Sequence, residues 1–374
     1  MSRRTARVIA ALMCLALLAT AGAEGVTLTY ADGRSAALPA TLDELLLNQS
    51  SRTYSPELAR LLMALAAAAY NDPDAGPEAE DAPLGTDSAS VKNLSGALRA
   101  LGFDGPGAAF RLVNYYKGDA PGYGEDSAAF ALGRKRLPGG ETLALVVIRG
   151  SHCKSDWDSN YRMDTGRDGA HAGFSAAAGK VLDALSDFLG GLPAEGVRYV
   201  LTGHSRGAAV ANLLAVKLHD AGVPNARVYD YNFACPDVAR QPGLAWGFAH
   251  GNIFNICNTA DLVCALPGAL GDGFSLLREG KPFTGWGKYG KTLYYSRREP
   301  RAYELVANTL GGGSLFRDRE SSHSPTRYVE DMEKLPTHFL TLAQVRLRRR
   351  TLGQLLTTED ADRIARLLDP EAGE

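Results

Sequence analysis

An apolar run that ends in Gly203-His204-Ser205-Arg206-Gly207 constrains the fold of this chain more than any other stretch. The run itself predicts a strand, and the alanine-rich residues 208–221 predict a helix. Gly203 and Gly207 lack a Cβ, so a strand and a helix can pack closely around a strained serine between them. A strand, a sharp turn with an exposed serine and a helix together make a nucleophile elbow. The alternative is a plain glycine turn with a solvated serine.

The first residues of the chain have the pattern of a signal peptide. Three arginines lie among the first seven residues, and an apolar stretch at 8–18 follows, which is too short to span a bilayer comfortably. Ala21-Gly22-Ala23 then provides a cleavage site before Glu24. We therefore expect residues 1–23 to be a signal peptide and the mature protein to be secreted or periplasmic.

Composition narrows the class of protein further. The chain has 374 residues with 40 basic and 42 acidic side chains, so no basic excess points to nucleic acid. Its hydrophobic content of 45% suits one large α/β domain with accessories. We divide the mature chain into an N-terminal helical and strand subdomain at 24–130 that completes the sheet, a catalytic core at 131–340 and a helical tail at 341–374. The arginine-rich tail predicts a solvated helix face rather than a membrane-surface patch.

Four cysteines remain after the expected signal peptide: Cys153, Cys235, Cys257 and Cys264. An even number in an exported protein suggests disulfides, with Cys257–Cys264 as the most local of the possible pairs. Four buried thiols are the alternative. The chain has no C-x-x-C motif and no histidine cluster, so we expect no metal site.

Strand patterns alternate with helix patterns along most of the chain, which predicts a mostly parallel sheet with crossover helices. Ser55 and Pro56 are good first residues for an apolar helix at 57–70. The expected helices lie at 57–70, 91–101, 174–189 and 208–221. The expected strands lie at 26–30, 110–116, 127–133, 143–148, 227–234 and 253–258, together with the strand that runs through Val200-Leu201-Thr202 into the elbow.

A serine hydroxyl needs a base to take its proton and a carboxylate to orient that base. On this kind of sheet the chain order is serine, acid, histidine. Asp261 lies in a turn just after the expected strand at 253–258, and we prefer it to Asp230 and Asp237. His323 lies just before a helix that Ser324 and Pro325 would begin, and we prefer it to His338, which we expect to be structural.

Two hydrogen-bond donors must also face the oxyanion that forms during acyl transfer. The backbone N–H of Arg206, directly after the nucleophile, is one candidate. The N–H of Ser151, with or without its hydroxyl, is the other, because Arg149-Gly150-Ser151 follows the apolar strand at 143–148.

Several further motifs occur in a fixed order between residues 140 and 330: Arg149-Gly150-Ser151, Asp156-Trp157, His171-Ala172-Gly173-Phe174, the elbow, Asn258-Thr259-Ala260-Asp261-Leu262-Val263 and Leu266-Pro267. In these motifs the chain resembles the class 3 lipases, a family of fungal-lipase-like α/β hydrolases, and in particular their secreted bacterial branch. The resemblance implies an α/β-hydrolase fold and a Ser205–His323–Asp261 triad that hydrolyses carboxylic esters through an acyl-enzyme without a cofactor. It also implies that His171 is structural.

The sequence departs from the family pattern in two places. The commonest family elbow has leucine after the serine, where this chain has Arg206, a cation that either favours an anionic substrate or pairs with a carboxylate. The lid segment 153–161 contains just two large apolar residues, Trp157 and Tyr161, so it can hide little apolar surface. We therefore expect weak interfacial activation, and short to medium acyl esters or lysophospholipid-like substrates as well as acylglycerols. Residues 268–293 form either a cap over the acyl pocket or a plain insertion.

These observations predict a secreted lipase or esterase that acts on a lipid or small ester and has no obligate protein partner, with at most transient contact with a lipid surface. Two alternatives stay open. A serine peptidase or amidase could use the same three residues, and a binding protein could keep the fold without the chemistry.

Overall fold

The computed structural model describes most of the chain between residues 26 and 344. The described residues are 26–30, 33–38, 41–47, 49–70, 89–115, 126–152, 156, 159–160, 162, 164–166, 168–193, 195–240, 249–266, 285–296, 322–334, 337–341 and 344. The expected signal peptide, most of the helical tail, Cys153, Trp157 and Tyr161 lie outside them, as does much of the insertion at 268–293.

Seven of the described strands form one sheet in the order β11-β9-β7-β6-β5-β4-β3. Their bounds are β3 Ala109–Val113, β4 Phe130–Arg136, β5 Thr142–Ile148, β6 Val197–His204, β7 Val228–Phe233, β9 Ile253–Asn258 and β11 Lys291–Tyr295. The strands from β5 to β11 pair in parallel, whereas β4 is antiparallel to both β3 and β5. The prediction of a mostly parallel sheet is therefore confirmed.

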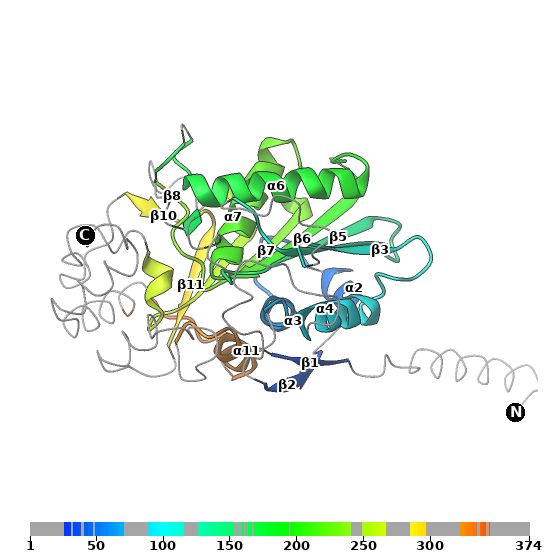
Figure 1. Cartoon of the computed structure of the whole chain (residues 1–374), viewed down its shortest axis with the longest axis horizontal. Helices are drawn as coiled ribbons and strands as arrows, with labels where there is room; N and C mark the ends of the chain where they lie inside the picture. The colour runs from blue at the N-terminus through cyan, green and yellow to red at the C-terminus, as the bar shows by residue number, and fades with distance from the viewer. Residues whose placement is uncertain are drawn as a thin grey trace, which may run out of the picture.

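Helices cover both faces of this sheet (Figure 1). The helices α6 and α7 pack on one face, and α3, α4 and α11 contribute to the core on the other. Their bounds are α3 Pro56–Ala68, α4 Ala89–Ala100, α6 Ala172–Leu189, α7 Arg206–Asp220 and α11 Pro325–Lys334. A mostly parallel sheet between two helical layers, with a serine turn between β6 and α7, is the α/β-hydrolase fold.

The start of helix α3 is determined by the local sequence signals at Ser55 and Pro56. Ser55 accepts a hydrogen bond from the backbone N–H of Leu58 through its hydroxyl, at 3.1 Å, and Pro56 takes the first helical position. Every residue from Leu61 to Ala68 is buried, because α3 lies between the sheet and α11. The predicted start and burial of this helix are confirmed, and it ends two residues earlier than expected.

Several short elements were not predicted from the sequence. They are β2 Ser35–Ala37, which pairs with the expected strand β1 Thr27–Thr29, the helix α2 Leu42–Leu47, the turn η3 Asn225–Arg227, and the pair β8 Ala239–Arg240 and β10 Trp286–Gly287. The strand at 26–30 was expected, and it pairs with β2 apart from the main sheet. The edge strand β11 was also missed, because its five residues follow glycines in a segment without clear alternation.

The register of the parallel strands fixes the edge at which polar loops can meet. Ile148 of β5 pairs with Gly203 of β6, Gly203 pairs with Asn232 of β7, and Asn232 pairs with Asn255 of β9. The carboxyl ends of these strands therefore lie level, and the loops that follow them share one rim. Ligands of open α/β sheets bind at this rim.

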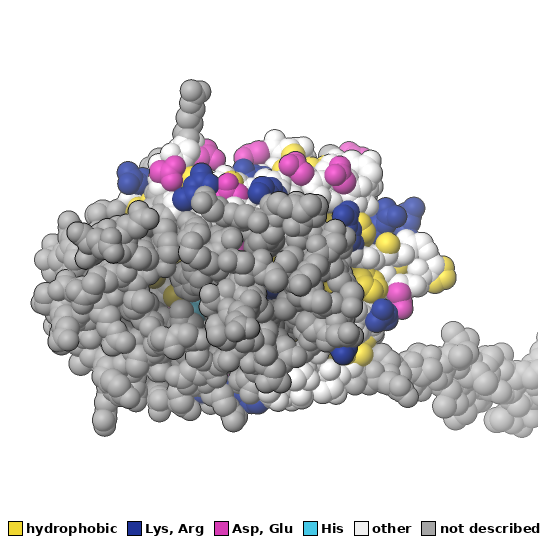
Figure 2. Space-filling view, in the orientation of Figure 1, with side chains coloured by type: hydrophobic (Ala, Val, Ile, Leu, Met, Phe, Trp, Pro, Cys, Tyr) yellow, Lys and Arg dark blue, Asp and Glu magenta, His cyan; other side chains and the backbone are white. Residues whose placement is uncertain are grey.

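Charged side chains of both signs are interspersed over the side of the molecule formed by α6 (Figure 2). This matches the nearly balanced charge of the sequence. Among the described helices, none is long and apolar enough to cross a bilayer.

A buried carboxyl lies in the core between the sheet and α7. Asp230 of β7 is fully buried; Asn232 donates a hydrogen bond to its Oδ2 at 2.7 Å, and Oδ1 has no partner among the described residues. Burial raises the pKa of this carboxyl well above its usual value of 3.8. The fold therefore favours the neutral form, and the stability that it gains from Asp230 is full below pH 3.8 and is lost as the pH rises.

We expect Asp230→Asn to raise the free energy of unfolding at pH 7 by about 1–3 kcal/mol, because an amide keeps the shape without a charge to bury. Urea unfolding between pH 4 and pH 7 measures this, with Asp187→Asn on the exposed side of α6 as the control. The difference in the free energy of unfolding between the variant and the parent should grow as the pH rises. An unchanged difference across this range would mean that the pKa of Asp230 is the same in the folded and unfolded states, and would contradict the effect of burial.

Candidate active site

Ser205 lies at the turn between β6 and α7 in a strained backbone conformation. Its φ of 57° and ψ of −127° are unusual for a residue with a side chain and cost on the order of 1–3 kcal/mol. Its N–H donates to the carbonyl of Phe233 at 2.9 Å, which ties the turn to β7. Its carbonyl accepts from the N–H groups of Ala208 and Ala209 in the first turn of α7. The strain is therefore held by the sheet on one side and the helix on the other.

The two glycines of the elbow are required by close backbone contacts. A Cβ at Gly203 would overlap the backbone of Gly207, and a Cβ at Gly207 would overlap the carbonyl of Ile148. The strand–turn–helix unit therefore closes as the sequence predicts, and the end of β5 lies directly against it. This places the Arg149-Gly150-Ser151 turn beside Ser205.

Asp261 lies where β9 ends, at the start of the short 3₁₀ turn η4 (Leu262–Ala265). Its N–H donates to the carbonyl of Asn258 at 3.0 Å, and its Oδ1 accepts from the N–H of Val263 at 3.0 Å. The carboxylate is thus fixed by the backbone on both sides, with its other oxygen directed toward the rim.

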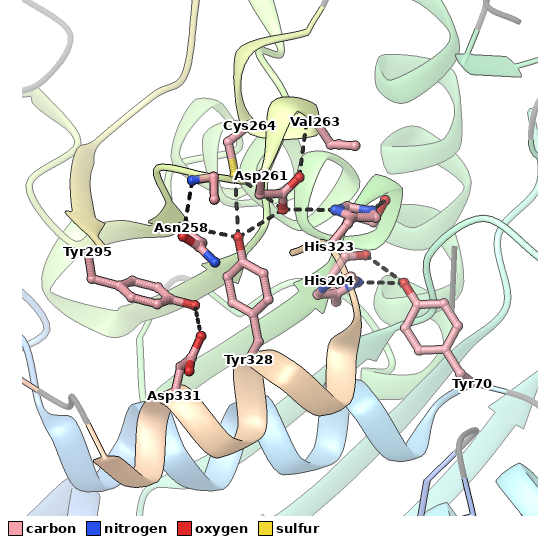
Figure 3. A network of polar contacts seen from close by, with 12 residues as sticks. Tyr70, His204, Asn258, Asp261, Val263, Cys264, Tyr295, His323, Tyr328 and Asp331 are labelled. Carbon is pink, nitrogen blue, oxygen red and sulfur yellow. Dashed lines mark hydrogen bonds and ion pairs between the residues drawn. The ribbon is translucent and has the colours of Figure 1, made fainter. Parts of the chain in front are cut away.

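His323 joins Ser205 and Asp261 into one chain of hydrogen bonds. Its Nε2 is 2.9 Å from Ser205 Oγ, and its Nδ1 is 2.8 Å from Asp261 Oδ2 (the aspartate pair is drawn in Figure 3). The exposed fractions of the three residues are 7%, 3% and 1% for Ser205, Asp261 and His323. The structure therefore brings together the three residues that the sequence singles out, in the order of contacts that a nucleophile, a base and an orienting acid require.

The rival residues lie elsewhere. Asp230 is inside the core, and Asp237 pairs with the buried ammonium of Lys288 at 2.6 Å. His338 is exposed, so the expectation that it is structural finds no support in its environment.

A second histidine lies against the site and was not singled out by the sequence. The Nδ1 of His204 is 2.8 Å from the Tyr70 hydroxyl, and its ring centroid is 4.9 Å from that of His323 (Figure 3). Complete burial, and then the nearby His323, hold the pKa of His204 well below its usual range. His204 is therefore a neutral ring that contacts Tyr70, two residues after α3, on one side and His323 on the other. The motif gave no signal for this, because Tyr70 is 134 residues away.

Of the two expected oxyanion donors, Arg206 belongs to the elbow and Ser151 belongs to the turn after β5. Ser151 follows β5 and is 1% exposed, and its Oγ accepts a hydrogen bond from Asn160 Nδ2 at 2.8 Å. Arg206 is the first residue of α7, so its N–H is one of the helix amides without an intrahelical acceptor. The two segments that carry these amides are neighbours, because Gly150 lies against the carbonyl of His204 and Gly207 lies against the backbone of Arg149.

The side chain of Arg206 points into the protein and forms a buried ion pair. Its guanidinium is 3.3 Å from Asp156 Oδ1, both side chains are 1% exposed, and it donates to the carbonyl of Ser127 at 2.8 Å and to the hydroxyl of Ser159 at 3.2 Å. The sequence left two roles open for Arg206, attraction of an anionic substrate or pairing with a carboxylate, and the structure shows the pairing. The second oxygen of Asp156 accepts from the N–H of His152 at 2.9 Å, so the pair also holds the turn that carries Ser151.

His171 has the structural environment that the resemblance implies. It begins helix α6, its Nδ1 accepts from the N–H of Phe174, and its ring stacks on that of Phe174 with centroids 3.9 Å apart. Burial lowers the pKa of His171 to about 4, so the ring is neutral.

The expected Cys257–Cys264 disulfide is wrong for this structure. Both residues are free and buried, as is Cys235. Cys264 Sγ lies instead 3.5 Å from the Tyr328 hydroxyl and 3.7 Å from Asp261 Oδ2, so it serves as a weak polar contact for the acid turn. In the described part of the chain, no group of three histidine, cysteine or acidic side chains is arranged to hold a metal ion.

The central part of the chain is similar to a known protein family. Residues 145–271 match the family model described as "Lipase (class 3)". Two curated relatives, the secreted mono- and diacylglycerol lipases A of Penicillium cyclopium and Penicillium camembertii, are each 32% identical over 134 residues. The match covers 34% of this chain and 43% of each relative, so this chain spans less than half the length of the curated relatives it matches.

Solved lipase structures also resemble the chain. M37 lipase has a TM-score of 0.43 and 16% identity, over 74% of this chain and 96% of that chain. The lipase of Rhizopus microsporus var. chinensis has a TM-score of 0.38 and 15% identity, over 72% of this chain and 83% of that one.

Proposed function

We propose that the chain is a serine hydrolase of carboxylic esters, a lipase or esterase that works through an acyl-enzyme, and the match of residues 145–271 to the class 3 lipase model supports this. One observation carries the proposal, namely the continuous hydrogen-bond chain from Ser205 Oγ through the His323 ring to Asp261. A neutral serine becomes nucleophilic only when a base is poised on its hydroxyl, and this arrangement supplies one.

The proposed reaction has two halves. Ser205 Oγ attacks the ester carbonyl while His323 Nε2 takes its proton, and the negative charge of the tetrahedral intermediate is stabilised by the N–H groups of Ser151 and Arg206. His323 then returns the proton to the leaving alcohol. Water, activated by the same imidazole, releases the acid and restores Ser205. Asp261 orients the ring and stabilises its charged form throughout.

The proposed substrates are acylglycerols or other acyl esters of short to medium chain, including lysophospholipid-like esters. The family pattern supports an acyl ester, and the small apolar content of residues 153–161 supports modest dependence on an oil surface.

We extend the proposal to a secreted or periplasmic protein of the bacterial branch, with a signal peptide at 1–23. The sequence pattern there supports export, and the curated relatives that match are fungal secreted lipases. The division into 24–130, 131–340 and 341–374 remains part of this proposal.

A matched pair of substrates tests the reaction class. We expect the protein to hydrolyse a p-nitrophenyl ester of a medium-chain acid, and to turn over the corresponding anilide at least about a hundredfold more slowly, because an amide has the poorer leaving group. A series of esters from short to long chains, assayed below and above their solubility limits, then measures chain preference and surface dependence together. Faster turnover of the amide would identify an amidase or peptidase instead.

A further inference from the structure

Asp261 accepts a hydrogen bond from a side chain that the proposed mechanism does not use. Its Oδ2 is 2.8 Å from His323 Nδ1 and 2.9 Å from the hydroxyl of Tyr328 (Figure 3). The two donors thus share one carboxylate oxygen, while Oδ1 takes the N–H of Val263. The imidazole therefore does not face an ordinary carboxylate, but one whose charge is partly engaged by a phenol.

The direction of the Tyr328 hydrogen bond follows from its other partner. The N–H of Asn258, at the end of β9, donates to the Tyr328 oxygen at 3.0 Å. A backbone N–H can only donate, so the tyrosine oxygen accepts there and its own hydrogen is free for Asp261. Two successive hydrogen bonds therefore connect the backbone at the end of β9, through the phenol, to the carboxylate.

Burial makes this contact strong and permanent. Tyr328 is fully buried and Asp261 is 3% exposed. Burial, followed by the negative charge of Asp261, holds the pKa of Tyr328 well above its usual range, so the phenol stays a donor at every working pH. Hydrogen bonds to a charged group are stronger than neutral ones, and more so away from water.

The same helix also determines where the base lies. His323 precedes α11 by two residues, and Tyr328 lies in its first turns. A second tyrosine, Tyr295 of β11, donates to Asp331 further along α11 at 3.1 Å and packs edge-on against Tyr328 with ring centroids 5.8 Å apart. Helix α11 therefore presents both the base and the hydroxyl that holds the partner of that base, and it is pinned to the sheet independently.

We infer that Tyr328 is a positioning residue for the proposed hydrolase, whose hydroxyl fixes the Asp261 carboxylate and moderates the negative charge that His323 meets. Without that hydroxyl, the full charge of Asp261 acts on the imidazole and stabilises its protonated form. Among the described residues, the titratable groups that face or act on this pair include Tyr328, Cys264 and His204, and also Tyr70 and Tyr295 through their electrostatic interaction with Asp261. Burial keeps the His204 ring neutral.

The pH dependence of a Tyr328→Phe variant tests the inference. We expect the midpoint of the acid limb of kcat/KM to move up by roughly half to one pH unit, since removing a donor strengthens the charge on Asp261. We expect kcat above that limb to fall about tenfold, because the carboxylate loses the hydrogen bond from the Tyr328 hydroxyl that helps to fix it. A chain with fluorotyrosine at position 328, a stronger donor of the same shape, should move the midpoint in the opposite direction.

Tyr295→Phe is the matched control, because it removes a buried tyrosine hydroxyl from Asp331, a carboxylate other than the one bonded to His323 Nδ1. The inference is overturned if the acid limb stays in place in both Tyr328 variants, or if Tyr295→Phe moves it equally. The inference rests on the proposed function, and the two can fail separately. A parent protein without ester turnover would contradict the function, whereas an active parent with unmoved profiles would contradict only the role of Tyr328.

Discussion

A Ser205→Ala variant is expected to lose kcat toward p-nitrophenyl esters by about ten-thousandfold or more. The methyl group cannot attack a carbonyl, and the acyl-enzyme cannot form. The remaining turnover would come from the amides near Ser205 acting on water. Alanine adds no atom to the tight turn, so the thermal midpoint should change by no more than a few degrees.

The control for this variant is Ser186→Ala, in the last turns of α6, far from the elbow in sequence and outside the hydrogen-bond chain. It should keep the activity of the parent. Ester turnover that survives in the folded Ser205→Ala protein within tenfold of the parent would rule out Ser205 as the nucleophile.

An Arg206→Leu variant, which restores the commonest family residue, is expected to be strongly destabilised. The variant would break the buried ion pair between Arg206 and Asp156, at a cost of about 3–5 kcal/mol in the free energy of unfolding. Activity should fall as well, because Asp156 also holds the N–H of His152 next to Ser151. Denaturant unfolding and ester kinetics measure the two effects.

A double variant, Arg206→Leu with Asp156→Asn, isolates the ion pair. It removes both charges and keeps an acceptor for His152, so we expect it to recover most of the stability that the single variant loses. Equal losses in the single and double variants would mean that the Arg206–Asp156 pair does not account for the effect.

The placement of the site was predictable because it depends on local signals at strand ends. The glycines around Ser205 and the turn after 253–258 each follow an apolar run, and parallel strands bring such turns to one rim. His323 was reached by chain order and by the helix start that follows it. None of these steps needed knowledge of which side chains touch.

The residues that support the site could not be predicted in this way. Tyr70 meets His204, Arg206 meets Asp156 and Tyr328 meets Asp261, and each contact joins segments between 50 and 134 residues apart. Sequence spacing says nothing about such contacts, because they depend on helix rotation and on the path of loops. The same limit explains the wrong disulfide, since closeness along the chain does not set the direction of two thiols.

The most direct test of the central claim is covalent labelling of the folded protein by a fluorophosphonate probe, with the modified peptide identified by mass spectrometry. The account predicts one stoichiometric adduct on Ser205, lost in His323→Ala, because only a hydroxyl activated by that imidazole reacts rapidly. A folded protein that takes up no probe, or that carries the adduct on another serine, would contradict it.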